Sequence, residues 1–338
     1  MSNSASTRAS LLSELISKRA VLVRRIYEPL TRLEKGSPEF TELLQSGKVW
    51  EDHFDPGNSS RYGYYKLQDV HERSLQEIDQ LKKSMRLPDR SIIESLIAEY
   101  AHQSVMIEDN KLGLGDSALL NDHLTATFFE SKDIASMSAS ELAETKLPDL
   151  QSLLPGAEPS QVAELRNHII ASHWVAHKAL QSVGTSGLNE EEVKCLSSLI
   201  IRGTSSEGLY SRWGGYRQNP VGVASDLLRV FPYHLEVPAL MQRFFEWRDN
   251  KKDLHPLILA CQATTYFLFI HPFPDGNGRV SRLIMQDLLT RQGYVPVVLK
   301  GVAREDYLRM IIKALDEDPG EFVAKVVAAQ LQTLQTFS

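Results

Sequence analysis

Apolar residues recur at intervals of three and four along most of this chain. That spacing places apolar side chains on one face of a helix, and a packed helical protein forms when such faces meet. The clearest stripes lie within residues 11–26, 92–100, 161–180, 193–200, 280–288 and 310–315, and a further helix is expected over 321–333. The pattern therefore predicts an all-α fold, preceded by an N-terminal helical region.

Turn-forming residues mark where several of these helices begin and end. Pro256 opens the apolar run 257–270, which predicts a buried helix with proline in its first turn. Asn189 precedes three glutamates, as in a helix N-cap with an acidic first turn, and Gly293 follows the stripe 280–288 as a stop. Residues 214–224 combine paired glycines, a proline and β-branched alternation, so they predict a short β-hairpin in an otherwise helical chain.

Composition divides the chain into three parts. Residues 1–10 are small and polar, which predicts a disordered start to an N-terminal helical extension over residues 1–87. Pro88 marks the start of a second part, residues 88–130, which contains the apolar helical stripe 92–100. Residues 131–159 are rich in Ser, Ala, Asp, Glu and Pro, typical of a linker, and they open a core expected over residues 131–338.

Charge and cysteine usage exclude several classes of protein. The chain has 37 Lys and Arg residues against 43 Asp and Glu residues, a net charge of −6, without a dense basic run, so no nucleic-acid partner is expected. Apolar runs fall short of the roughly 18 residues of a membrane helix, so no membrane partner is expected either. Cys195 and Cys261 lack metal-binding spacing, which predicts reduced thiols and a cytoplasmic location, with the nucleus as the other compartment.

The segment 271–282 carries the clearest chemistry in the sequence. Pro272 and Pro274 prevent a regular helix between His271 and Asp275, so an imidazole and a carboxylate share one constrained loop and can converge on one ligand. A histidine with an unperturbed pKa titrates near neutral pH and can accept a proton there. The segment therefore predicts a site for proton transfer.

Two glycines and two arginines in the same segment indicate that the ligand is an anion. Gly276 and Gly278 allow positive φ, so backbone N–H groups can turn inward as a nest at the start of the helix 280–288. Arg279 and Arg282 lie on one face of its first turn, where cations oppose the helix dipole unless an anion binds between them. The residues that define a P-loop or a dinucleotide fingerprint are absent, so the site is a phosphate site of another kind.

Residues 271–282 resemble the signature of the Fic family, His-x-Phe-x-Asp/Glu-Gly-Asn-Gly-Arg-x-x-Arg, at every specified position. The resemblance implies the Fic fold, a helical core with a β-hairpin flap, and transfer of AMP from ATP to a Ser, Thr or Tyr hydroxyl of a target protein. His271 would be the general base and Asp275 the Mg²⁺ ligand. The phosphates would be bound by Gly276, Asn277, Gly278, Arg279 and Arg282.

Three further segments resemble elements of that family. Residues 104–110 are similar to its auto-inhibitory motif, Ser/Thr-x-x-x-Glu-Gly/Asn, with Ser104 and Glu108 in the defining positions and Asp109 where Gly or Asn is usual. The resemblance implies that Glu108 pairs with Arg282 and blocks the γ-phosphate. If Asp109 substitutes as a partner, or repels ATP, Glu108→Gly alone gives a muted gain, so the strength of inhibition stays open. Residues 214–224 resemble the flap, which docks the target by strand addition. The nucleotide contacts implied outside the signature are Val223, Ala224 and Tyr307.

Other interpretations remain open at this stage. The related reaction is removal of AMP, in which Glu108 orients a water and His271 protonates the leaving hydroxyl. A non-catalytic nucleotide-sensing module, kept shut by Glu108, is an alternative of a different class. Residues 104–110 could also be a solvated helix end, and His173 and His177 fit a helix interior better than a metal site because no third ligand lies near. The resemblance is also compatible with a homodimer.

Overall fold

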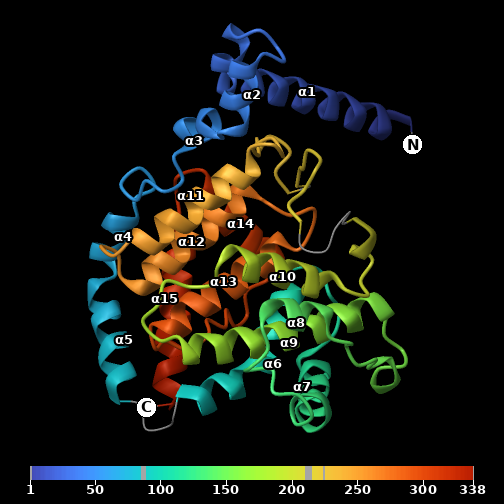
Figure 1. Ribbon diagram of the computed structural model, residues 1–338, viewed down its shortest axis with the longest axis vertical. Helices are drawn as coiled ribbons and strands as arrows, with labels where there is room; N and C mark the ends of the chain where they lie inside the picture. The colour runs from blue at the N-terminus through green and yellow to red at the C-terminus, as the bar shows by residue number, and fades with distance from the viewer. Residues whose placement is uncertain (1, 85–88, 210–214, 224, 338) are drawn as a thin grey trace.

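The computed structural model describes residues 2–84, 89–209, 215–223 and 225–337, with backbone alone for residues 2–12, Asp89 and Leu209. In these residues the regular structure is helical and is joined by loops, as Figure 1 shows. The N-terminal half contains α1 (Ser2–Ile26), α2 (Pro38–Gln45), α3 (Lys48–Phe54), α4 (Tyr64–Val70), α5 (Glu72–Ser84), α6 (Asp89–Met106), α7 (Leu114–Leu124), α8 (Ala139–Glu144) and α9 (Pro159–Gln181). The C-terminal half contains α10 (Glu190–Ile201), α11 (Val237–Asn250), α12 (Pro256–Ile270), α13 (Asn277–Arg291), α14 (Arg304–Leu315) and α15 (Gly320–Phe337).

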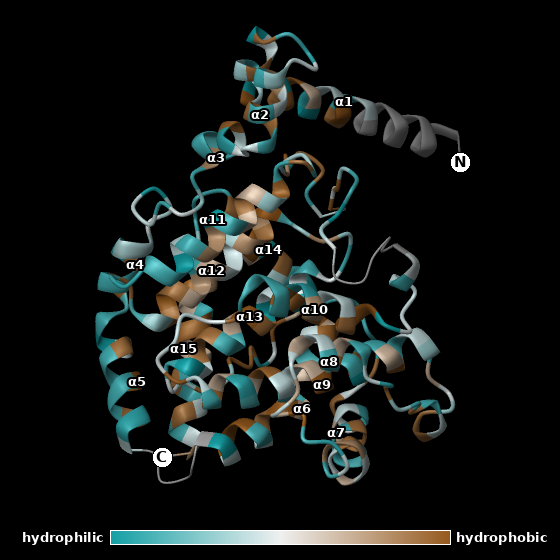
Figure 2. Ribbon diagram, viewed as in Figure 1, coloured by the Kyte–Doolittle hydropathy of each residue, from teal (hydrophilic) through white to brown (hydrophobic). Residues whose placement is uncertain are grey.

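Helices α12 and α13 form the centre of the core. Nearly every residue of both is buried, and α12 packs on α13, α11 and α15 while α13 also packs on α9 and α10. α12 is apolar on every face, as the colouring in Figure 2 indicates, and such a helix is stable inside a protein because neighbouring helices cover it. α13 buries charged side chains as well, among them Arg279, Arg282 and Asp287. The loop that joins α12 to α13 is therefore supported from both sides by rigid elements.

The N-terminal extension is attached to this core through buried side chains. The indole of Trp50 donates from Nε1 to the carbonyl of Val230 at 3.1 Å, and the hydroxyl of Tyr27 donates to Glu236 at 2.5 Å. Helix α1 begins at Ser2 and projects from the body (Figure 1), so the expected disordered start over residues 1–10 is not what the structure shows. Ala5 and Ala9 are strong helix formers, which allows the helix to extend back from the apolar stripe.

Most helix boundaries agree with the predictions from turn residues. Pro256 is the first residue of α12, and the side chain of Asn189 caps α10 by accepting from the N–H of Glu192 at 2.9 Å. Gly293 has a φ of +75°, as a helix stop requires. The expected helical fold is confirmed by these elements. None of the described helices is long and apolar enough to cross a membrane.

The predicted β-hairpin is not confirmed. Residues 215–223 and 225–235 contain no strand, and one isolated bridge joins Val223 to Asp226. The ends of the predicted hairpin, Gly214 and Ala224, lie outside the described residues. The backbone N–H of Arg217 donates to the carbonyl of Pro272 at 2.9 Å. Among the described residues, this segment is therefore joined to the α12–α13 loop through the backbone of Arg217.

Candidate functional site

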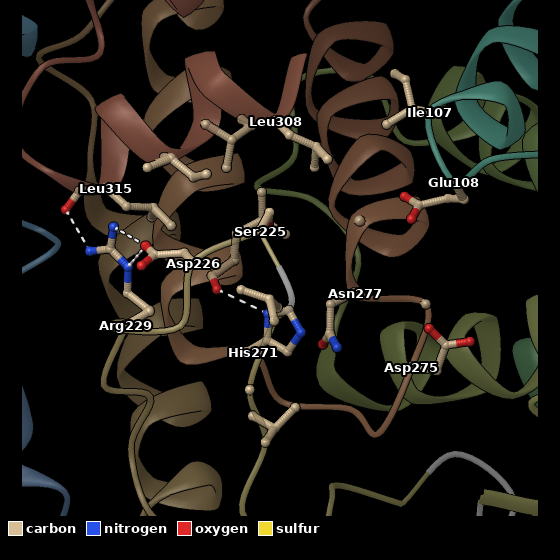
Figure 3. A pocket seen from close by; sticks show the side chains of 18 of the residues that line it. Ile107, Glu108, Ser225, Asp226, Arg229, His271, Asp275, Asn277, Leu308 and Leu315 are labelled. Carbon is tan, nitrogen blue, oxygen red and sulfur yellow. Dashed lines mark hydrogen bonds and ion pairs between the residues drawn. The ribbon is translucent and has the colours of Figure 1, made fainter. Parts of the chain in front are cut away.

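The ends of three helices meet around one cavity. The C-terminus of α12, the N-terminus of α13 and the C-terminus of α6 border a space of about 320 Å³. Figure 3 shows His271, Asn277, Asp275 and Glu108 around this space. The structure therefore brings the predicted base, metal ligand and inhibitory glutamate, which are up to 167 positions apart in the sequence (275 minus 108), into one site.

His271 lies at the C-terminal cap of α12 with its backbone in the left-handed region, at φ 52° and ψ 60°. Its Nδ1 lies 3.3 Å from the carbonyl of Leu268, so this nitrogen carries the proton in the neutral ring and Nε2 has the free lone pair. Burial lowers the pKa of His271 to about 4. This differs from our expectation of an ordinary histidine pKa, because the ring is partly buried and packs against Phe231, with ring centroids 4.6 Å apart, and the charge of Arg217 lowers the pKa further.

Asn277 fixes the shape of the loop. Its side-chain oxygen accepts from the N–H of Phe273 at 2.9 Å, and its side-chain nitrogen donates to the carbonyl of Phe273 at 2.8 Å. Both functional groups of this buried amide are thus used within the loop. Any contact of Asn277 with a phosphate would have to come from its backbone N–H, at the first position of α13.

The two glycines are required for different reasons. Gly276 has a φ of +77°, so it supplies the left-handed turn that the sequence predicted. Gly278 lies inside α13 and does not have positive φ, so that part of the prediction was wrong. A β-carbon at position 278 would overlap the carboxylate of Glu108 and lie 3.2 Å from Nη1 of Arg282. Gly278 therefore leaves room for an anion at the start of α13.

Glu108 pairs with Arg282, as the resemblance implied. Nη2 of Arg282 lies 2.7 Å from Oε1 of Glu108, and Nε of Arg282 donates to the hydroxyl of Ser104 at 2.7 Å. Burial raises the pKa of Glu108, but Arg282 and then Arg279 outweigh burial, so the net pKa lies below its usual value and the carboxylate is charged. Nη1 of Arg282 is buried without a partner among the described residues.

The sequence did not indicate two residues that hold this ion pair in place. Arg304, at the start of α14, donates to the carbonyl of Ile107, the residue before Glu108. Glu164 on α9 pairs with Arg279, with 2.6 Å between its Oε1 and Nη1 of the arginine, and accepts from the amide of Asn110 at 2.8 Å. For Glu164, the sequence offers one clue, which is an acidic residue between Ala163 and Leu165 within an apolar helical stripe. Both signature arginines are therefore matched by carboxylates.

Asp109 has a different partner from Glu108 in this structure. Its carboxylate pairs with Lys111, and its φ is +75°. The N–H of Asn110 donates to the carbonyl of Val105 at 3.1 Å and that of Asp109 to the carbonyl of Met106 at 3.0 Å, the two bonds of a Schellman motif. Position 109 is thus the left-handed residue that ends α6, where Gly or Asn is most easily accommodated.

Asp109→Gly is expected to raise the midpoint of thermal unfolding by a few degrees, because glycine adopts the left-handed conformation without a β-carbon clash. Asp109→Ala is the matched control, since it removes the same carboxylate but keeps the β-carbon. Differential scanning calorimetry of both variants provides the comparison. Equal midpoints for the two variants would mean that backbone conformation does not limit stability at this position.

Asp275 is placed to meet a cation at the edge of the cavity. Burial raises the pKa of its carboxyl group, but Arg279 and other neighbours outweigh burial and hold the pKa below the usual value. The described residues contain no group of three His, Cys, Asp or Glu side chains suited to a metal ion. Mg²⁺ commonly takes one or two carboxylates and completes its shell with phosphate oxygens and water. A single charged carboxylate beside a phosphate site fits that mode of binding.

The remaining predicted nucleotide contacts lie partly in the cavity wall. Val223 and Tyr307 both line it, and Ala224 lies outside the described residues. The guanidinium of Arg282 lies over the ring of Tyr307, 5.5 Å from its centroid. Leu308, Ile311 and Ile312 extend the apolar side of the same wall. The cavity thus has a charged end at α13 and an apolar end at α14.

Comparison with known proteins identifies relatives of the central part of the chain. Residues 187–289 match the Fic/DOC family. Proteins named protein adenylyltransferase Fic from Drosophila willistoni and Drosophila melanogaster are each 36% identical over 126 residues, which is 37% of this chain and 25% of theirs. The chain therefore spans about a quarter of the length of these curated relatives.

Solved structures share the fold over a larger part of the chain. A Fic-domain-containing signalling protein from Bacteroides thetaiotaomicron has a TM-score of 0.56 at 19% identity and covers 78% of this chain and 99% of its own. Fic-1 from C. elegans has a TM-score of 0.56 at 16% identity and covers 97% of this chain and 96% of its own. The shared architecture thus includes helices outside residues 187–289.

Proposed function

Because residues 187–289 form a Fic domain, we propose that this protein is an adenylyltransferase that moves AMP from ATP to a hydroxyl group of a target protein. The observation that carries the proposal is the shared cavity of His271, Arg282 and the N-terminus of α13. A neutral imidazole lies there beside a site suited to phosphate, so a base and an anion-binding helix end face one space.

In the proposed reaction, Nε2 of His271 accepts the proton of the attacking Ser, Thr or Tyr hydroxyl. The hydroxyl oxygen forms a bond to the α-phosphorus, and the bond between that phosphorus and the oxygen leading to the β-phosphate breaks. Pyrophosphate leaves with the electron pair of the broken bond. The lowered pKa of His271 keeps Nε2 unprotonated at neutral pH, so the base is ready before the substrates bind.

Buried donors at the charged end of the cavity would bind the phosphates. Nη1 of Arg282 and Nε of Arg279 are buried without partners among the described residues, and a buried donor left unpaired is destabilising. Phosphate oxygens would satisfy such donors together with the free N–H groups at the start of α13. Tyr307 and Val223 would contact the adenosine at the apolar end.

Asp275 would hold Mg²⁺ next to the phosphates. When bound, the ion would neutralise charge that develops on pyrophosphate. The contribution of the protein is a carboxylate that stays charged, because Arg279 and other neighbouring groups hold its pKa down despite burial. The ion would take its other ligands from the nucleotide and from water.

Asp275→Ala is expected to leave a low rate of transfer that no longer responds to added Mg²⁺. The reason is that the variant lacks the carboxylate that would retain the ion. Auto-labelling measured across a Mg²⁺ titration tests this. Asp253→Ala, which removes a carboxylate between α11 and α12, should keep the normal response. A normal Mg²⁺ response in Asp275→Ala would remove this residue from the metal site.

The proposed activity is tested by the position of the label in ATP. The protein is incubated with ATP labelled at the α-phosphate and, separately, at the γ-phosphate. AMP transfer predicts covalent label from the first nucleotide and none from the second, because the γ-phosphate leaves with pyrophosphate. Label from γ-labelled ATP alone would indicate phosphoryl transfer. No label from either, with the Glu108→Gly variant included, would contradict the proposal.

The identity of the acceptor protein is a separate part of the proposal. We expect a protein with an exposed Ser, Thr or Tyr, bound along residues 215–223, which run beside the cavity without regular structure. An extended partner segment could pair with free backbone groups there. Mass spectrometry for AMP adducts in a lysate treated with ATP and the protein would identify the acceptor.

Removal of AMP is a second candidate reaction. Glu108 is charged and lines the same cavity as His271, so it could orient a water for attack on a bound phosphodiester. A pre-labelled acceptor would then lose AMP in the presence of the wild type and keep it with Glu108→Gln. A non-catalytic sensing role is less well supported, because a neutral, oriented His271 would have no task in it.

A further inference from the structure

Arg217 is a completely enclosed arginine that lies directly behind the loop bearing His271. Its side chain is 2% exposed. Nε donates to the carbonyl of His271 at 2.8 Å, and the backbone N–H donates to the carbonyl of Pro272 at 2.9 Å. One residue therefore satisfies two consecutive carbonyl groups at the catalytic end of α12.

The two terminal nitrogens of the guanidinium bind backbone carbonyl groups in the chain segment between α10 and α11. Nη2 donates to the carbonyl of Pro232 at 2.6 Å, and Nη1 donates to the carbonyl of Asn219 at 3.1 Å. The neighbouring residue Phe231 packs its ring against the imidazole of His271. Arg217 thus binds the backbone of His271 and also the backbone of Pro232. Pro232 follows Phe231, whose ring contacts the His271 side chain.

The backbone of His271 needs such a partner. A residue other than glycine in the left-handed region is strained, so this conformation persists only where neighbouring groups hold it. A buried carbonyl without a donor would add a further penalty. The fork of Arg217 supplies the donor, so the left-handed turn that directs the ring into the cavity is maintained.

We propose that Arg217 is a positioning residue for His271, which holds the catalytic ring in place through the carbonyl groups of His271 and Pro232. The inference rests on the proposed function and adds to it a residue that does not touch the substrates. Arginine is suited to this task because its planar fork donates in several fixed directions at once, whereas lysine donates from a single point.

The charge of Arg217 supports a specific role. Its guanidinium donates to neutral carbonyl groups. Burial lowers the pKa of Arg217 to about 10. The nearby carboxyl of Glu236 is a weak counter-charge, since burial raises its pKa to about 7. A buried cation with so little compensation is costly for stability, but an apolar side chain would leave the carbonyl groups of His271, Pro232 and Asn219 without this donor.

The test uses Arg217→Gln and Arg217→Lys, each combined with Glu108→Gly so that transfer is measurable. We expect Arg217→Gln to lower kcat for auto-labelling by at least about tenfold while the Kd for ATP changes by less than about twofold, because displacement of a catalytic group affects the chemical step. Arg217→Lys should recover part of kcat. A role in folding alone would not separate kcat from ATP binding in this way.

Arg248→Gln is the matched control, because Arg248 is also buried and donates to a carbonyl, that of Leu188 at 2.6 Å, outside the cavity. It should reduce the unfolding midpoint without lowering kcat. An unchanged kcat in folded Arg217→Gln, or an equal loss of kcat and ATP binding, would overturn the inference. If Arg217→Gln does not fold, the same comparison of kcat with the Kd for ATP is made on Arg217→Lys. Absence of label in the Glu108→Gly parent would instead contradict the proposed function, and the inference with it.

Discussion

Glu108→Gly is expected to raise the rate of AMP transfer by about ten- to a hundredfold. Oε1 of Glu108 lies 2.7 Å from Nη2 of Arg282, and a charge-assisted hydrogen bond of this kind contributes about 1.5–3 kcal/mol. A ligand that needs the same guanidinium must displace the carboxylate first. Without the carboxylate, ATP no longer has to break this bond before it binds Arg282. Each 1.4 kcal/mol saved in this way tightens binding about tenfold.

The measurement is the auto-labelling rate and the Kd for ATP in wild type, Glu108→Gly and Glu108→Gln. The glutamine variant keeps the size of the side chain but removes its charge, so it should lie between the other two. Asp109→Gly should change neither quantity, because Asp109 pairs with Lys111. The change in free energy measured for the double variant, Glu108→Gly with Asp109→Gly, should then equal the sum of the changes measured for the two single variants. If neither rate nor affinity rises in Glu108→Gly, residues 104–110 are no more than the end of a helix.

His271→Ala is expected to lower the rate of transfer by about 10²–10⁴-fold while ATP binds nearly as well as before. The base acts on the incoming hydroxyl, and its loss therefore affects the transition state more than the bound nucleotide. Single-turnover labelling in the Glu108→Gly background, with ATP binding by calorimetry, separates the two effects. His177→Ala is the control, since His177 lies on α9 away from the cavity.

The lowered pKa of His271 gives this prediction a pH dependence. With a pKa of about 4, caused chiefly by burial, the ring stays neutral as the pH falls from 7.5 to about 5.5, so transfer should stay nearly constant over that interval. A histidine with an ordinary pKa would lose most of its base form below about pH 6.5. A decline of the rate centred near that value, or equal losses of transfer and ATP binding in His271→Ala, would contradict the assignment.

Much of the fold could be predicted because local signals agreed with tertiary packing. The apolar stripe 92–100 indicated helix α6, and Pro256 and Asn189 marked the starts of α12 and α10. The segment 214–224 was different. Its glycines and β-branched residues favour a hairpin locally, but its described part makes a backbone contact between Arg217 and Pro272, 55 positions apart (272 minus 217). Local preference cannot reveal such a contact.

The candidate site could be located from the sequence, but its electrostatics could not. Residues 271–282 identified the loop because their chemistry is contiguous in the chain. Glu164 and Arg304 belong to other helices, so nothing in their neighbourhood indicated that they face Arg279 and the end of α6. The pKa of His271 depends on burial beneath Phe231, which is again a property of the folded chain.

The anchoring of α6 determines how quickly the proposed inhibition could be relieved. Tyr100 donates to the carbonyl of Arg282 at 2.6 Å, Gln103 binds the backbone of Leu299, and Arg304 holds the carbonyl of Ile107. The helix is therefore fixed up to the residue before Glu108, whose side chain remains 29% exposed. Release would then require breaking one ion pair and rotating the side chain of one glutamate, and not the opening of a structural element. Relief of the proposed inhibition therefore needs no unfolding of α6, only a ligand that competes for Arg282.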